Sequence, residues 1–176
     1  MKSYLAYGSN LHPVRLQLRI ASVKSRGIIC LSGYKLVFNK IGVDGSAKCN
    51  IIKEDKSVAY CAVYEVTEMQ IYSLDEFESF GRGYEKLRVT CRLDDRSEDC
   101  FTYIAMPEYI DDHLLPFDWY KEMVVVGARY HRLPIEYIRN IEAVQAIKDL
   151  DIQRVGQARL TLSKMLANEA RVARVA

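Results

Sequence analysis

The apolar residues of this chain follow one period in the first two thirds and another in the last third. Short runs rich in β-branched and aromatic residues, some alternating with polar ones, are typical of strands. These runs cover residues 4–6, 27–31, 33–39, 47–52, 57–66, 84–91 and 100–105. Helical spacing of apolar residues predicts helices over 67–78, from 118, from 133 and over 151–176. Strands first and helices last indicate an α+β fold with a mostly β core.

Composition narrows the class of protein. The 176 residues, 49% of them hydrophobic, are enough for one domain with a proper core. The 25 basic and 23 acidic residues are interspersed and leave a net charge of +2, so we expect no nucleic-acid partner. No apolar stretch approaches the ~20 residues that a membrane span needs. The N-terminus shows no secretory pattern, so we expect a cytoplasmic protein with no membrane partner.

The cysteines and histidines form no recognisable metal or nucleophile pattern. The five cysteines are scattered without a CxxC pair, which fits neither a disulfide framework nor a zinc site, so we expect reduced thiols and no metal. His12, His113 and His131 stand beside a proline, an acid or an arginine in predicted loops, and we expect them at the surface. No Gly-x-Ser-x-Gly elbow occurs, and no cysteine stands beside a plausible base, which disfavours a covalent hydrolase.

The first candidate for chemistry is the stretch 4–10, Tyr-Leu-Ala-Tyr-Gly-Ser-Asn. Gly8 breaks the predicted strand, and Ser9 and Asn10 are good N-cap residues for a short helix. A strand that turns into a helix N-terminus leaves several backbone N–H groups unpaired and pointing the same way. Such a nest attracts a carboxylate or a developing oxyanion. The alternative is a purely structural junction, since strand–Gly–Ser–helix turns are common in α/β folds.

The second candidate is an acidic cluster at the end of the helix predicted over 67–78. Asp75, Glu76 and Glu78 stand just before a turn that contains Gly81 and Gly83. Negative charge at a helix C-terminus opposes the helix dipole, so a carboxylate kept there is a candidate for functional use. The alternative is a solvated acidic helix face.

Taken together and in order, six segments resemble the γ-glutamylcyclotransferase family. The segments are 4–10 (YLAYGSN), 33–39 (GYKLVFN), 58–66 (VAYCAVYEV), 74–78 (LDEFE) before a Gly-Tyr pair, 119–128 (WYKEMVVVGA) and 133–137 (LPIEY). The similarity covers roughly residues 1–145, so we expect a family domain over 1–145 and a helical extension over 146–176. Two departures stand out. Ser79 and Phe80 separate Glu78 from glycine, and Cys49-Asn50 replace a frequent Gly-Ala pair, which can change the size of the cavity.

The resemblance implies a fold, a reaction and a site. The fold is a small mixed, twisted or closed β-barrel with surrounding helices and a substrate cavity at one mouth. The reaction converts a γ-glutamyl amine or γ-glutamyl amino acid into 5-oxoproline and a free amine, without metal or organic cofactor. Glu78 would be the catalytic carboxylate. The substrate-binding residues would be Tyr4, Leu5, Ala6, Tyr7, Gly8, Ser9, Asn10 and Tyr120.

These residue types suit the chemistry. A γ-glutamyl group carries its own nucleophile, the α-amine, and Glu78 could take a proton from the α-ammonium and return it to the leaving nitrogen. Amides of Gly8, Ser9 and Asn10 could hold either the oxyanion or the α-carboxylate. The alternatives are a non-catalytic module that binds a small anionic, γ-glutamyl-like ligand, or the same chemistry on a γ-glutamylated natural product or isopeptide. The sequence does not identify the leaving amine, and it leaves open whether the protein forms a homodimer.

Overall fold

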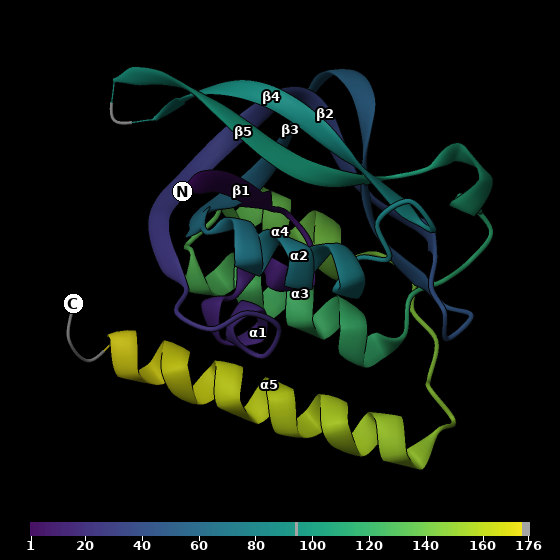
Figure 1. The fold of residues 1–176 in the computed structure, drawn as a ribbon. Helices are drawn as coiled ribbons and strands as arrows, with labels where there is room; N and C mark the ends of the chain where they lie inside the picture. The colour runs from purple at the N-terminus through teal and green to yellow at the C-terminus, as the bar shows by residue number, and fades with distance from the viewer. Residues whose placement is uncertain (94, 174–176) are drawn as a thin grey trace.

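A five-stranded sheet forms the centre of the computed structural model, which describes residues 1–93 and 95–173. Its strands are β1 (Lys2–Ala6), β2 (Lys24–Ile41), β3 (Ala47–Val66), β4 (Tyr84–Leu93) and β5 (Arg96–Ala105). They lie in the order β2-β3-β1-β5-β4, and β1 runs antiparallel to β3 and parallel to β5. The short first strand therefore occupies the middle of the sheet, and the strands curve over the helices gathered beneath them (Figure 1).

Two of the strands are longer than the sequence predicts. The runs 27–31 and 33–39 belong to the single strand β2, and the runs 47–52 and 57–66 belong to β3. The pairing of these two strands shifts register between Ser32 and Tyr34, where the partner jumps from Val58 to Lys53. Irregularities of this kind bend a strand without ending it. The residues between these runs are therefore part of a long bent hairpin.

The helix before the acidic cluster is confirmed. It is α2 (Glu68–Phe77), and it begins with a capping box, in which Thr67 Oγ1 accepts from the Gln70 amide at 3.2 Å. The Gln70 side chain accepts in turn from the Thr67 amide at 2.9 Å. These reciprocal bonds satisfy two N–H groups that a helix N-terminus otherwise leaves unpaired. Local bonds thus fix where the helix begins, and Glu78 is the residue that caps its C-terminus.

The turn after β1 is built differently from the prediction. It contains a 3₁₀ turn, η1 (Ser9–Leu11), and then the short helix α1 (Pro13–Gln17). Neither helical segment is capped by Ser9 or Asn10. The cap of α1 is His12, whose Nδ1 accepts from the Val14 amide at 3.1 Å.

The expectation of three surface histidines is wrong for two of them. His12 is fully buried and His131 is half-buried, whereas His113 is exposed. The loop that carries His12 is covered because η1 packs on α3 (Asp118–Tyr130) and α1 packs on α5 (Ile152–Ala173). Burial, together with a smaller effect of His131, lowers the pKa of His12 to about 4. The sequence showed a loop, but only the tertiary contacts make that loop part of the interior.

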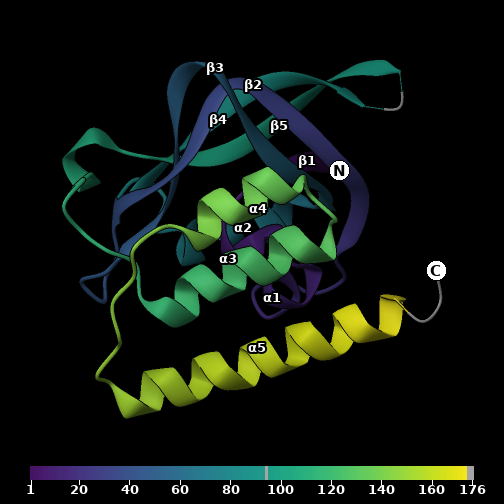
Figure 2. The same ribbon diagram turned by 180° about the vertical axis from the view of Figure 1, so that it is seen from behind.

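The remaining helices cover the lower side of the sheet. Viewed from behind, α3 and α4 (Ile135–Glu142) run beneath the strands and α5 lies below them (Figure 2). A further 3₁₀ turn, η2 (Pro107–Tyr109), follows β5. Asp118 is the first residue of α3 and not its cap, a role that Phe117 fills without a side-chain bond.

The α+β fold with a curved sheet and surrounding helices is confirmed, although the sheet is not a closed barrel. Within residues 1–93 and 95–173, no pairing joins the edge strands β2 and β4. The five cysteines are free thiols, four of them buried and Cys30 exposed. In the part of the chain that the structure describes, no helix is long and apolar enough to cross a membrane.

Candidate active site

A cavity of about 230 Å³ lies where the turn after β1, the end of α2 and the start of α3 meet. The predicted site residues that line it are Tyr4, Tyr7, Gly8, Ser9, Asn10, Glu78 and Tyr120. Leu5 and Ala6 do not line it, because both are completely buried in the centre of the sheet. There the carbonyl of Leu5 accepts from Thr102 Oγ1 at 2.7 Å. Those two residues support the turn instead of facing the cavity.

Glu78 caps the C-terminus of α2, and its side chain is 15% exposed. Its Oε1 accepts from Asn10 Nδ2 at 2.9 Å and from a short bond donated by Arg19 Nη1. Both bonds end on the same oxygen. Among the described residues no donor bonds to Oε2. The carboxylate is therefore held at one oxygen and available at the other.

Arg19 is the cation that holds Glu78. Burial disfavours the charge on Arg19, but attraction to Glu78 and, to a lesser extent, to the neighbouring tyrosines outweighs burial and leaves the pKa of Arg19 raised. The guanidinium also lies over the ring of Phe77, with Cζ 5.6 Å from its centroid. An arginine buried in this way is a fixed positive charge that holds the Glu78 side chain in one orientation.

Three tyrosines that line the cavity are uncharged, and each hydroxyl makes one hydrogen bond within the protein. Tyr7 donates to the carbonyl of Tyr103, and Tyr120 accepts from the Cys49 amide at 3.1 Å. The Tyr4 hydroxyl accepts from Asn10 Nδ2 at 3.1 Å, which leaves its own proton available. Burial raises the pKa of Tyr4, Tyr7 and Tyr120. None of the three can act as a base near neutral pH.

The glycine of the turn is required by a protein neighbour. A Cβ on Gly8 would stand 2.9 Å from Cys49 Cβ and 3.4 Å from Cys49 Sγ. Cys49 is buried, and burial raises its pKa to about 12, so it is a thiol and not a nucleophile. Cys49 lines the cavity, at the position where the resembled family often has a Gly-Ala pair. The neighbouring Asn50 braces the fold, since its Oδ1 accepts from the Ala105 amide at 2.9 Å.

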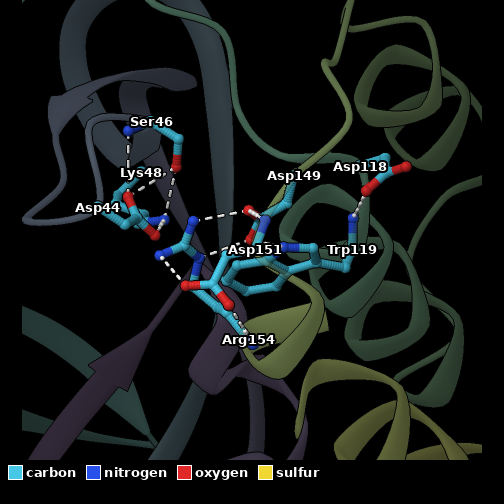
Figure 3. A network of polar contacts seen from close by, with 8 residues as sticks. All are labelled: Asp44, Ser46, Lys48, Asp118, Trp119, Asp149, Asp151 and Arg154. Atoms are coloured by element: carbon cyan, nitrogen blue, oxygen red, sulfur yellow. Dashed lines mark hydrogen bonds and ion pairs between the residues drawn. The ribbon is translucent and has the colours of Figure 1, made fainter. Parts of the chain in front are cut away.

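Trp119 forms part of the cavity wall. Figure 3 shows the polar network that joins Trp119 to the segment after α4. The indole N–H of Trp119 donates to Asp149 Oδ2 at 2.9 Å. Arg154 of α5 bonds both oxygens of Asp149 at 2.6 Å. On the other side, Lys48 Nζ lies 5.2 Å from the Trp119 ring centroid and pairs with Asp44 at 2.7 Å. The predicted extension thus contributes a brace behind the cavity wall.

Sequence reasoning missed four cavity cations, Arg15, Arg19, Lys40 and Lys48. Arg15 and Arg19 are four residues apart just after the turn, a spacing that puts two side chains on one helical face. That signal was present in the sequence. Lys40 stands near the end of a strand beside a glycine loop, and no local pattern marks it. Within the described residues, no three His, Cys, Asp or Glu side chains come together as a metal site.

Comparisons with known proteins identify the family of this chain. Residues 4–122 match the family described as "Gamma-glutamyl cyclotransferase, AIG2-like". The γ-glutamylcyclotransferases of Homo sapiens and Bos taurus are 28% and 26% identical to this chain, and each match covers 81% of the chain and 78% of the relative. A solved structure named γ-glutamyl cyclotransferase superposes with a TM-score of 0.75 at 22% identity, over 88% of this chain and 96% of that one. The chain belongs to the γ-glutamyl cyclotransferase, AIG2-like family.

Proposed function

We propose that this protein converts a γ-glutamyl amine or γ-glutamyl amino acid into 5-oxoproline and a free amine. The observation that carries the proposal is the meeting of the Gly8–Asn10 turn with the unbonded Oε2 of Glu78 in one cavity. The relatives that match most of the chain are themselves named γ-glutamylcyclotransferase. Glu78 is the proton carrier, and the substrate is a small γ-glutamyl compound.

The reaction needs one proton carrier and no outside nucleophile. The α-ammonium of the substrate gives a proton to Oε2 of Glu78, and the resulting amine attacks its own γ-carbonyl carbon. The tetrahedral intermediate collapses when Glu78 returns the proton to the leaving nitrogen and the amide C–N bond breaks. The ring nitrogen then loses its second proton to the freed Glu78 carboxylate, which passes it to the released amine, so the products are 5-oxoproline with a neutral amide nitrogen and an ammonium ion. Folding the substrate into the attack geometry supplies much of the acceleration, since effective molarities reach about 10⁵ M or more.

The other carboxylate in the cavity is a poorer proton carrier than Glu78. Asp44 uses Oδ1 for the amide and hydroxyl of Ser46 and Oδ2 for Lys48. Burial disfavours its charge, but these bonds outweigh burial and keep the pKa of Asp44 below its usual value. Asp44 therefore remains ionised and occupied, which leaves Glu78 for the chemistry.

The turn after β1 supplies the donors. The N–H groups of Ser9 and Asn10 begin a helical turn, where intrahelical partners are lacking. They can bind the substrate α-carboxylate or the oxyanion at the γ-carbonyl, and Tyr4 can donate its free hydroxyl proton beside them. Gly8 keeps this turn close to Cys49, so its direct role is to set the backbone position.

The test is incubation of the purified protein with γ-glutamyl-alanine and detection of 5-oxoproline by mass spectrometry. We expect stoichiometric release of 5-oxoproline and alanine. A panel of γ-glutamyl amines, including γ-glutamyl-lysine isopeptide, extends the test to the leaving group. Saturable binding of these compounds without any product would overturn the enzyme proposal in favour of a binding module.

A further inference from the structure

The charges that line the cavity do not balance. Four cations face it, Arg15, Arg19, Lys40 and Lys48, against only two carboxylates, Asp44 and Glu78. Arg19 pairs with Glu78, and Lys48 pairs with Asp44 at 2.7 Å. In the part of the chain that the structure describes, no carboxylate lies within ion-pair distance of Arg15 or Lys40. The cavity therefore carries two positive charges without a carboxylate partner among the described residues.

Lys40 is the more informative of the two because it is only 5% exposed. Its Nζ lies 4.9 Å from the centroid of the Tyr84 ring and makes a cation–π contact with that ring. A Cβ on Gly83 would stand 3.0 Å from Nζ, so the missing side chain at Gly83 makes room for the ammonium group. Burying an ammonium group without a carboxylate partner costs free energy. Burial lowers the pKa of Lys40, and the attraction of Glu78 and Asp44, neither of which lies within ion-pair distance, does not restore it.

Arg15 shows the same lack of a partner. Its Nε is buried and makes no hydrogen bond with any described residue. Burial and the nearby positive charge of Arg19 lower its pKa to about 10, so it remains a cation at neutral pH. Both side chains line the cavity that holds Glu78.

The substrate must bring the missing negative charge, and its γ-glutamyl part cannot. The α-ammonium and α-carboxylate of a γ-glutamyl group cancel each other. A neutral amino acid as leaving amine supplies one carboxylate, and an amino acid with an acidic side chain supplies two. Only the second case neutralises both Arg15 and Lys40.

We infer that the preferred leaving amine is an acidic amino acid with two carboxylates, and that Lys40 is the residue that selects it. This inference rests on the proposed cyclotransferase function. Polyamines and the ε-amine of lysine, which add positive charge, are the poorest leaving groups. The pairing of Lys40 with a carboxylate in a largely desolvated site gives selectivity as well as binding, because the wrong substrate leaves the ammonium unpaired.

The experiment compares two nearly isosteric substrates, γ-glutamyl-glutamate and γ-glutamyl-glutamine, in the purified protein at low ionic strength. We expect kcat/KM to favour γ-glutamyl-glutamate by at least about tenfold, and the preference to shrink as salt is added. In Lys40→Met the ratio of the two kcat/KM values should fall to about one. The control is Lys35→Met, which removes an exposed lysine of the same strand that pairs with Glu54 and should leave the ratio as in the wild type.

The outcomes separate the two levels of the argument. Equal kcat/KM values for the two substrates in the wild type overturn the inference, while release of 5-oxoproline from both upholds the proposed function. A wild-type preference that survives Lys40→Met overturns the role of Lys40. Absence of 5-oxoproline from every γ-glutamyl compound overturns the proposed function and the inference with it. The wild-type ratio and its salt dependence need no variant, so a folding defect in Lys40→Met does not remove the test.

Discussion

Two carboxylate–arginine pairs of this protein look alike in kind and differ in how fully each carboxylate is bonded. Glu78 is bonded at Oε1 alone, by Arg19 and Asn10. Asp149 is bonded at both oxygens by Arg154 and receives two further bonds, from the Trp119 indole and the Asp151 amide. One pair holds a carboxylate ready at the cavity, and the other locks a carboxylate behind its wall.

The difference indicates what each carboxylate can do. A carboxylate with every lone pair used has no site for a passing proton, and its work is to fix the groups that bond to it. A carboxylate that an arginine and an amide orient through one oxygen can exchange a proton through the other. The position of Glu78 at a helix C-terminus, unfavourable in isolation, is compensated by the buried Arg19.

Glu78→Gln breaks the comparison most strongly. The amide keeps the shape of the side chain but cannot carry the proton, so we expect kcat on γ-glutamyl-alanine to fall by about 10³-fold. The measurement is the initial rate of 5-oxoproline release, with the melting temperature as a check of folding. Glu76→Gln, an exposed neighbour on the same helix, is the matched control and should retain the wild-type rate. A Glu78→Gln protein with wild-type turnover would remove Glu78 from the mechanism.

Arg19→Met tests the orienting half of the same pair. Without the guanidinium, Glu78 loses one of its two bonds on Oε1, and we expect kcat to fall about 10- to 100-fold with a smaller change in KM. Arg19→Lys should recover part of kcat, because it restores the charge but not the fork geometry. The control is Arg139→Met, which removes an exposed ion pair with Glu136. An unchanged kcat in Arg19→Met would show that Asn10 alone orients Glu78.

Local patterns predicted the elements of the fold better than their continuity. The capping box at Thr67 and Gln70 depends on residues three apart, and the predicted helix start is correct. The break predicted between residues 31 and 33 is wrong, because pairing with β3 carries β2 through a register shift at Ser32. Whether a polar stretch ends a strand or bends it depends on the partner strand, which a local pattern does not contain.

The same limit applies to the cavity. The turn at Gly8 and the acid Glu78 each sit in a short motif, and the structure brings them together. Lys40 could not be found in this way, since it reaches the cavity only because β2 is one continuous strand and Gly83 leaves space for Nζ. Asp149 and Arg154 lie beyond the residues that carry the family resemblance, and the bond from Trp119 to Asp149 joins positions thirty residues apart along the chain.

Asp149→Asn tests the fully bonded pair. The amide cannot accept at both positions from Arg154 and also from Trp119, so the brace behind the cavity wall weakens. We expect the melting temperature to fall by about 2–6 °C, KM for γ-glutamyl-alanine to rise a few-fold and kcat to stay within about twofold. Calorimetry and steady-state kinetics measure these effects. A loss of kcat as large as that of Glu78→Gln would show that Asp149 does more than position Trp119.

Lowering the pH tests the Asp149–Arg154 pair again, with a smaller expected effect on the melting temperature. The hydrogen bonds from Arg154 outweigh the burial of Asp149 and hold its pKa well below the usual value. A carboxylate whose pKa is depressed in the folded state contributes stability that is present above its unfolded pKa of about 4 and is lost as the pH falls below that value. The difference in melting temperature between the wild type and Asp149→Asn should therefore be constant from about pH 7 to pH 5 and shrink toward about pH 3. Thermal melts of both proteins in matched buffers measure the difference, and an equal difference at the two ends of the range would show that the ion pair with Arg154 does not stabilise the fold.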